Sequence, residues 1–163
     1  MMQLVLILEL LVLIAVANGT PVVAKRLFGE TWAQPLDGGV TWRDGRPLFG
    51  PSKTIRGVVL SLLITPLFAL ALGFAWQLGL VVSATVMAGD LLSSFIKRRM
   101  GLAPSSQAIG LDQIPESLFP LIASRWMLPV SFLDIVAGVA IFLLAAPILS
   151  RLFFLMGLRD QPH

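Results

Sequence analysis

Long uncharged stretches dominate the chain and predict membrane-spanning helices. Residues 57–89 carry no charged side chain, and this run exceeds the roughly 20 residues that one helix needs to cross a bilayer. Gly73 and Gly79 predict a turn inside it, which gives two helices. Residues 117–158 are nearly uncharged and are interrupted near Pro129, so they also predict two helices. Together with the apolar start of the chain, the pattern predicts an all-α, polytopic membrane protein with about five transmembrane helices, at residues 1–17, 57–74, 78–96, 114–130 and 134–157.

The composition supports a membrane protein and excludes several soluble classes. Apolar residues make up 56% of the chain and charged residues 13%, with a mean hydropathy of +0.88. Soluble domains carry about 25% charged residues, so a disordered chain, a coiled coil and an ordinary soluble globule are excluded. Cysteine is absent, which excludes a disulfide scaffold. We expect the 163 residues to form a single transmembrane domain, residues 1–163.

Lysine and arginine gather in the two predicted long loops, and this sets the expected orientation. The loops at 18–56 and 97–113 hold most of the basic side chains. Because cytoplasmic loops are enriched in Lys and Arg, we expect both loops and the C-terminus in the cytoplasm and the N-terminus outside, in the cell (inner) membrane. Ala15–Ala17 resembles a signal-peptidase site, but no positive segment precedes it. The first helix is therefore expected to be retained, and four helices remain if it is removed.

The first loop ends in a basic segment that is suited to phosphate binding. Lys53, Thr54, Arg56 and Gly57 stand where the second helix begins, and the backbone N–H groups of a helix N-terminus favour anions. The alternative is an anchor at the depth of the lipid headgroups. Upstream, Asp37 lies in a glycine- and proline-rich run, which an anchor does not need.

Asp90 is a charged residue inside the third predicted helix, where charge is costly unless it serves a site. Asp90, Ser94 and Lys97 have a spacing that places them on one helical face, with Arg98 at its margin. A hard cation such as Mg²⁺ suits a carboxylate in this setting. The alternatives are an ion pair of Asp90 with Arg125 or with Lys97. We therefore predict that Asp90 binds metal or substrate.

Asp112 is a second carboxylate on the same side of the membrane. It shortly precedes Pro115 and Glu116, a pattern typical of a helix start, so helix capping is its alternative role, and both roles can hold at once. One histidine and no cysteine exclude a His/Cys metal site, a cysteine nucleophile and a Ser-His-Asp triad. The remaining Asp, Lys, Arg, Ser, Thr and Gly residues are typical of phosphoryl or nucleotidyl transfer, where positioning and charge neutralisation do most of the work.

A series of short motifs runs from the first loop to the start of the fourth predicted helix. These are Asp37-Gly38-Gly39, Gly45-Arg46, Lys53-Thr54-Ile55-Arg56-Gly57, Gly89-Asp90, Ser94-Phe95-Ile96-Lys97-Arg98-Arg99 and Asp112-Gln113. In this order and spacing they resemble the CDP-archaeol synthase family, which are membrane cytidylyltransferases related to the CTP:phosphatidate cytidylyltransferases. The resemblance implies that a lipid phosphate attacks the α-phosphorus of CTP, giving a CDP-activated lipid and pyrophosphate, with Mg²⁺.

The resemblance also implies roles for individual residues. Asp90 and Asp112 would bind Mg²⁺, and together with Lys97 they form the implied catalytic set. The implied nucleotide and phosphate contacts are Lys53, Thr54, Arg56, Gly57, Ser94, Arg98, Arg99, Gln113 and Asp37. The implied partners are CTP, a lipid phosphate and membrane lipids, without nucleic acid, and a homodimer is compatible with such a protein.

One stretch departs from the family pattern. The archaeal pattern continues Asp-Gln-Leu-Asp, whereas this chain has Asp112-Gln113-Ile114-Pro115-Glu116. Either Glu116 takes over the role of the missing aspartate, or that role is absent. The lipid stays open among ether, diacyl and other long-chain phosphates. A transporter or scaffold subunit without enzymatic activity is the competing hypothesis, although a transporter would favour polar residues at mid-membrane and an internal repeat.

Overall fold

The computed structural model describes residues 2–103, 106, 108 and 110–157, and within them the protein is an all-helical bundle. Its five helices are α1 (Leu4–Phe28), α2 (Ile55–Ala71), α3 (Trp76–Arg99), α4 (Gln113–Ser124) and α5 (Phe132–Leu155). The part of the chain that is described forms no strand beyond two isolated bridges inside the first long loop and at its end. The prediction of an all-α, polytopic architecture is confirmed.

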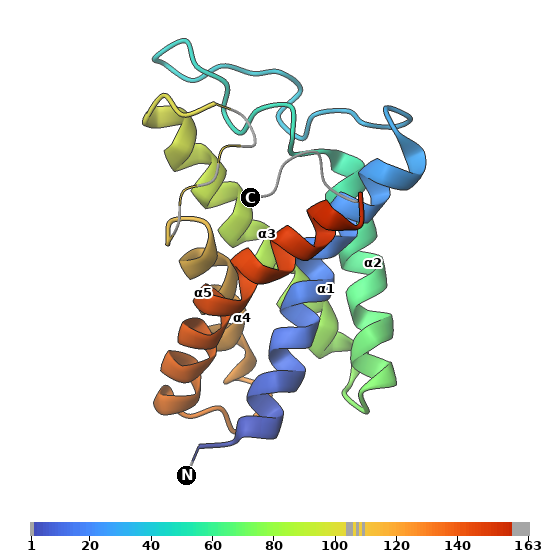
Figure 1. The fold of residues 1–163 in the computed structure, drawn as a ribbon, viewed down its shortest axis with the longest axis vertical. Coiled ribbons are helices and arrows are strands. Elements are labelled where there is room, and N and C mark those ends of the chain that lie inside the picture. Colours follow the sequence, from blue (N-terminus) through green and yellow to red (C-terminus); the bar gives the residue numbers. More distant parts are fainter. Residues whose placement is uncertain (1, 104–105, 107, 109, 158–163) are drawn as a thin grey trace.

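Both long loops lie at the same end of the bundle (Figure 1). α1 rises from the N-terminus toward this end, α2 returns, α3 rises again, α4 descends and α5 rises last. Three helices, α1, α3 and α5, are long and apolar enough to cross a membrane. α2 is a shorter apolar helix of 17 residues, and α4, predicted as a full span at 114–130, has only 12. At 1.5 Å per residue, α4 is about 18 Å long, which is less than the hydrocarbon thickness of a bilayer.

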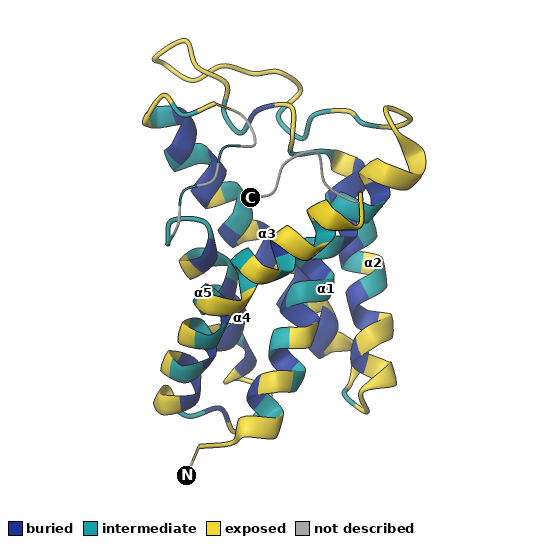
Figure 2. Cartoon of the chain, in the orientation of Figure 1, coloured by how far each residue is buried: buried dark blue, intermediate teal, exposed yellow. Residues whose placement is uncertain are grey.

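The bundle buries one stripe of each helix and turns the rest outward. The best-buried side chains are aliphatic residues of α1 and α3, including Leu10, Leu13, Ile14, Val82 and Val86. The outer surfaces of the helices are exposed in Figure 2, and there they carry large apolar side chains such as Val5, Leu63, Leu67, Leu133, Leu144 and Ile148. Outward apolar surface of this extent fits a lipid environment.

α1 continues well past residue 17, although Gly19 and Pro21 predict a loop there. A proline in a helix removes one N–H and leaves the carbonyl four residues earlier without its partner. Here that carbonyl belongs to Ala17, and the Ser61 hydroxyl of α2 donates to it at 3.0 Å. Membrane helices tolerate proline when a neighbouring side chain satisfies the freed group in this way. The first loop therefore begins at Gly29 rather than at residue 18.

α3 and α4 approach most closely at Gly89. A Cβ at this position would lie 2.5 Å from the carbonyl oxygen of Pro115, so only glycine permits the contact. Gly89 lies ten residues before Arg99, the last residue of α3. The first turn of α4 therefore lies about 15 Å deeper in the bundle than the end of α3. Non-helical backbone at that depth must line a polar or protein-filled space, and the charged residues described below lie there.

Candidate active site

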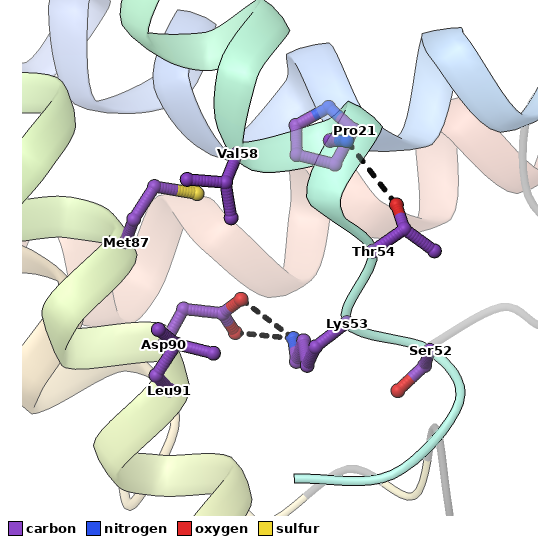
Figure 3. Close-up of a pocket in the computed structure, with 9 residues that line it drawn as sticks. Pro21, Ser52, Lys53, Thr54, Val58, Met87, Asp90 and Leu91 are labelled. Carbon is purple, nitrogen blue, oxygen red and sulfur yellow. Dashed lines mark hydrogen bonds and ion pairs between the residues drawn. The ribbon is translucent and has the colours of Figure 1, made fainter. Parts of the chain in front are cut away.

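The centre of the candidate active site is an ion pair between Lys53 and Asp90 (Figure 3). Lys53 Nζ lies 2.5 Å from Oδ1 and 2.6 Å from Oδ2 of Asp90, so one ammonium holds both carboxylate oxygens. Lys53 is placed by Thr54, the N-cap of α2, whose hydroxyl accepts a hydrogen bond from Gly57 N at 3.2 Å. Lys53, Thr54, Gly57 and Asp90 all line one pocket, together with Pro21 of α1. Lys53 and Asp90, which are 37 residues apart in the sequence, thus pair at the N-terminal end of α2.

A second ion pair joins the end of α3 to the start of α4. Lys97 Nζ lies 2.7 Å from Asp112 Oδ1, and it donates to the backbone oxygen of Ser106 at 2.9 Å. The other oxygen of Asp112 accepts from Ala108 N at 3.0 Å. Asp112 makes no capping bond to α4. Asp112 thus stands at the N-cap position of α4, as predicted, but its carboxylate anchors the loop above it instead of bonding to the helix.

Glu116 places a third carboxylate beside these pairs. It lies in the first turn of α4, next to the Gly89 contact, and its Oε2 accepts from Asn18 Nδ2 of α1 at 3.0 Å. Burial of Lys53 acts to lower its pKa, but the attraction of Asp90, Glu116 and Asp112 outweighs this and raises the pKa above its ordinary value. The Lys53 side chain therefore stays an ammonium ion across the physiological range.

Arg98 brings a further positive charge with unused donors. It is 4% exposed, and its Nη2 donates to the carbonyl of Ala103 at 2.8 Å. Its Nε and Nη1 are buried and find no hydrogen-bond partner among the residues that the structure describes. Buried donors without partners are costly, and an anion supplied by a ligand would satisfy them. Ser94 is also buried, one turn before Arg98 on α3.

Three other predicted site residues serve the loops. Arg99, the last residue of α3, holds the first loop, since its guanidinium pairs with Asp44 at 2.8 Å and donates to Pro47 O at 2.5 Å. Asp37 organises the first loop, because its two oxygens accept backbone N–H groups from Gly39, Phe49 and Gly50 at 2.9–3.0 Å. Gln113 braces the second loop by accepting from Gly110 N at 2.6 Å.

Arg56 is not brought to the Lys53–Asp90 pocket. Lys53, Thr54, Gly57 and Val58 line that pocket, whereas Arg56 lines a separate groove with Phe28, Trp32, Gln34, Ile55, Val59 and Leu60. Because successive residues of a helix are about 100° apart, these two sets lie on opposite faces of α2.

Two sequence alternatives for Asp90 are wrong. Asp90 pairs with neither Arg125 nor Lys97, because Arg125 stands at the far end of α4 and Lys97 is engaged by Asp112. Sequence reasoning also missed a hydrogen bond that ties the first loop to the end of α3. In it, Arg46 Nη1 donates to Arg99 O at 2.7 Å. Only the charge of Arg46 and its place in a motif hinted at that role.

The carboxylates of the site are suitable ligands for a hard cation, but each of the two aspartates is paired with a lysine. Among the described residues, no group of three Asp, Glu, His or Cys side chains is close enough together to hold a metal ion. Mg²⁺ usually takes one or two carboxylates and completes its shell with phosphate oxygens and water. Asp90 and Asp112 therefore fit such an ion in donor chemistry, provided that a phosphate completes the shell and draws Lys53 from Asp90.

Comparison with known proteins identifies the family. A family model described as CarS-like CDP-archaeol synthase matches residues 67–162. A CDP-archaeol synthase of Thermococcus onnurineus is 40% identical over 139 residues, which cover 78% of this chain and 75% of that protein. One of Thermofilum pendens is 31% identical over 153 residues, covering 90% of this chain and 75% of that protein.

A solved structure agrees as well. An intramembrane enzyme for archaeal membrane lipid biosynthesis superimposes with a TM-score of 0.64 at 28% sequence identity, and the match covers 83% of this chain and 89% of that one. The sequence matches and the shared bundle point the same way. This chain belongs to the CarS-like CDP-archaeol synthase family.

Proposed function

We propose that this membrane cytidylyltransferase transfers CMP from CTP to a lipid phosphate at the site around Lys53 and Asp90. Membership of the family supports the making of a CDP-activated lipid and disfavours a transporter or scaffold subunit. The observation that carries the assignment to this site is the partly buried lysine–aspartate pairs, with the buried guanidinium of Arg98 next to Lys97, beneath the two basic loops. Such a set neutralises phosphate charge and positions reacting groups, which is what nucleotidyl transfer requires.

The positive groups have a clear task in this reaction. Lys53 pairs with Asp90, and Lys97 and Arg98 lie about two turns further along α3; all three would bind the triphosphate, with the Nε and Nη1 of Arg98 as ready donors. An oxygen of the lipid phosphate attacks the α-phosphorus of CTP, the new P–O bond forms, and the bond to the β-phosphate oxygen breaks to release pyrophosphate. The attacking phosphate is already ionised at neutral pH, so the protein need supply no strong base.

We further propose that Asp90 and Asp112 hold Mg²⁺ when CTP is bound. The ion would neutralise charge on the phosphates. Lys53 would then bind a phosphate oxygen in place of the Asp90 carboxylate, so that both would keep a partner of opposite charge. Glu116 and Asn18 keep the α1 and α4 walls of the site together through their 3.0 Å hydrogen bond.

The test is pyrophosphate release by the purified protein, with CTP and Mg²⁺, across phosphatidic acid and a bis-prenyl glycerol phosphate. Release with one lipid identifies both reaction and substrate. A supporting result also requires that release stops when Mg²⁺ is chelated. CTP binding that survives Lys53→Ala and Arg98→Gln together would contradict the placement of the triphosphate.

We propose that the basic loops face the cytoplasm. The arginines and lysines of residues 29–54 and of the end of α3 lie at one end of the bundle, and positively charged loops are retained on the cytoplasmic side. The chain has no cysteine, so a single cysteine placed at exposed Arg43 or at Trp126 reports one side each. Labelling of position 43 by an impermeant maleimide from outside intact cells would contradict this orientation.

A further inference from the structure

Arg56 carries a buried positive charge without a counter-charge. Its side chain is buried to all but 8% of its surface at the first turn of α2. The guanidinium donates from Nη1 to the carbonyls of Gly29 and Thr31, and it lies 5.9 Å from the ring centroid of Phe28. Its Nε is buried and has no hydrogen-bond partner in the described part of the chain. Within residues 2–103, 106, 108 and 110–157, no carboxylate pairs with Arg56. A buried charge in this state is costly, and an anionic ligand would offset that cost.

The groove beside Arg56 is apolar and opens outward. Besides Arg56 and Gln34 it is lined by Phe28, Trp32, Ile55, Val59 and Leu60. Trp32 is 74% exposed and adopts a left-handed backbone with φ 55°, which is unusual for a bulky residue. The bond from Arg56 to the preceding carbonyl, that of Thr31, helps to hold this turn. One guanidinium at the head of an apolar groove matches a lipid with a negatively charged headgroup.

The depth of the groove also matches a lipid. Ile55 and Arg56 begin α2, at the end of the bundle where the basic loops lie, while Val59 is one turn further into the membrane. Lipid phosphates lie at this boundary and acyl chains extend inward from it, and tryptophan is enriched at the same level. A headgroup phosphate at Arg56 would therefore place its chains along exposed Val59.

We propose that this groove binds the phosphate of an anionic membrane phospholipid, at a site separate from the reaction centre. The groove occupies the face of α2 opposite Lys53 and Gly57, so a phosphate bound there is separated from Asp90 by the helix itself. The occupant is thus a structural lipid of the surrounding bilayer rather than the reacting lipid phosphate. The proposal rests on the embedding of the helices in a membrane and not on the catalytic chemistry.

Native mass spectrometry of the detergent-purified protein tests this, with phosphatidylglycerol as the anionic probe and phosphatidylcholine as the zwitterionic control. We expect phosphatidylglycerol to bind at least about tenfold more tightly than phosphatidylcholine, because both lipids bring a phosphate to Arg56 but phosphatidylcholine also brings a quaternary ammonium that cancels its charge. Arg56→Gln should abolish this preference. Arg43→Gln removes the same charge from an exposed position of the same loop and should leave it intact.

Two further variants keep the result interpretable if Arg56→Gln folds poorly. Val59→Trp fills the groove without touching the charge and should weaken phosphatidylglycerol binding by a similar factor. Asp90→Asn alters the reaction centre and should leave phosphatidylglycerol binding unchanged. Equal binding of both lipids by the wild type would overturn the proposal. So would binding that is limited to phosphatidic acid and lost in Asp90→Asn, because the groove would then belong to the substrate site.

Discussion

Gly89→Ala tests whether the crossing of α3 and α4 sets the geometry of the site. The added Cβ would lie 2.5 Å from the carbonyl oxygen of Pro115 and 2.8 Å from Glu116 N, whereas ordinary contacts begin at 3.4 Å. Both atoms are backbone, so no side chain can move aside. The two helices must separate locally by about 0.9 Å, the difference between 3.4 and 2.5 Å, or distort.

The expected cost follows from this displacement. Overpacking of a close contact typically costs about 1–3 kcal/mol of stability. The larger effect should fall on turnover, because Asp90 and Glu116 directly follow the two contacting residues along the chain. A displacement near 1 Å in a reaction site can cost roughly 100-fold in rate. We therefore expect a folded but strongly impaired enzyme, measured by pyrophosphate release and by thermal unfolding in detergent.

Gly19→Ala is the matched control on α1. A Cβ at Gly19 meets only the ring of Phe153, at 3.5 Å, which is an ordinary contact. Alanine is also favoured over glycine in a helix by roughly 0.5–1 kcal/mol, so this variant should be as stable as the wild type or slightly more so. If Gly89→Ala retained wild-type turnover and stability, the close crossing would not be what positions Asp90 and Glu116.

Three other substitutions separate chemistry from structure. Asp90→Asn should lower turnover at least about 100-fold while the protein stays folded in detergent, because the amide no longer carries the charge that Lys53 and a cation need; an active variant would remove Asp90 from the mechanism. Asp134→Ala should lower the unfolding temperature and leave the turnover of folded protein unchanged, since this carboxylate accepts from Gln3 N at 2.8 Å and completes the capping box of α5. Partial burial acts to raise the pKa of Asp37, but its backbone N–H donors outweigh this and hold the pKa below its ordinary value. The loop stabilisation from Asp37 is therefore complete above pH about 4 and is lost as the pH falls further, so the protection of the Phe49 amide, which is the slowing of its exchange relative to an unstructured peptide at the same pH, should fall in acid for the wild type and much less for Asp37→Asn.

The sequence predicts the helical architecture because lipid leaves few alternatives to it. Uncharged runs identify helices without tertiary information, since a backbone in hydrocarbon must satisfy its own hydrogen bonds. The limits of the prediction come from long-range contacts. Gly19 and Pro21 are typical helix breakers in water, and only the Ser61 hydroxyl on another helix explains why α1 runs to Phe28.

For the candidate site, too, the sequence predicts local features but not the long-range contacts. Helical spacing correctly places Asp90 and Lys97 on one helix, but it cannot show that Lys53 from the first loop pairs with Asp90. The pairing of Arg99 with Asp44 likewise joins residues 55 apart, so the sequence could not show that Arg99 ties the first loop to the end of α3, while its predicted phosphate contact stays a prediction. Charge and spacing identify candidates, and packing decides what each of them faces.

The departure at Pro115 shows how packing can absorb a change in sequence. Pro115 directs its backbone against Gly89, in the first turn of α4, where a missing N–H leaves no intrahelical bond unmade. The next residue, Glu116, turns by about 100° and reaches Asn18 of α1 while its charge acts on Lys53. Asp90, Glu116 and Asp112 therefore all attract the Lys53 ammonium, although Glu116 stands one position later than the second aspartate of the family pattern. Of the two alternatives posed by the sequence, we propose that Glu116 takes over the role of the missing aspartate. The longer glutamate side chain can offset a backbone that the proline holds against α3.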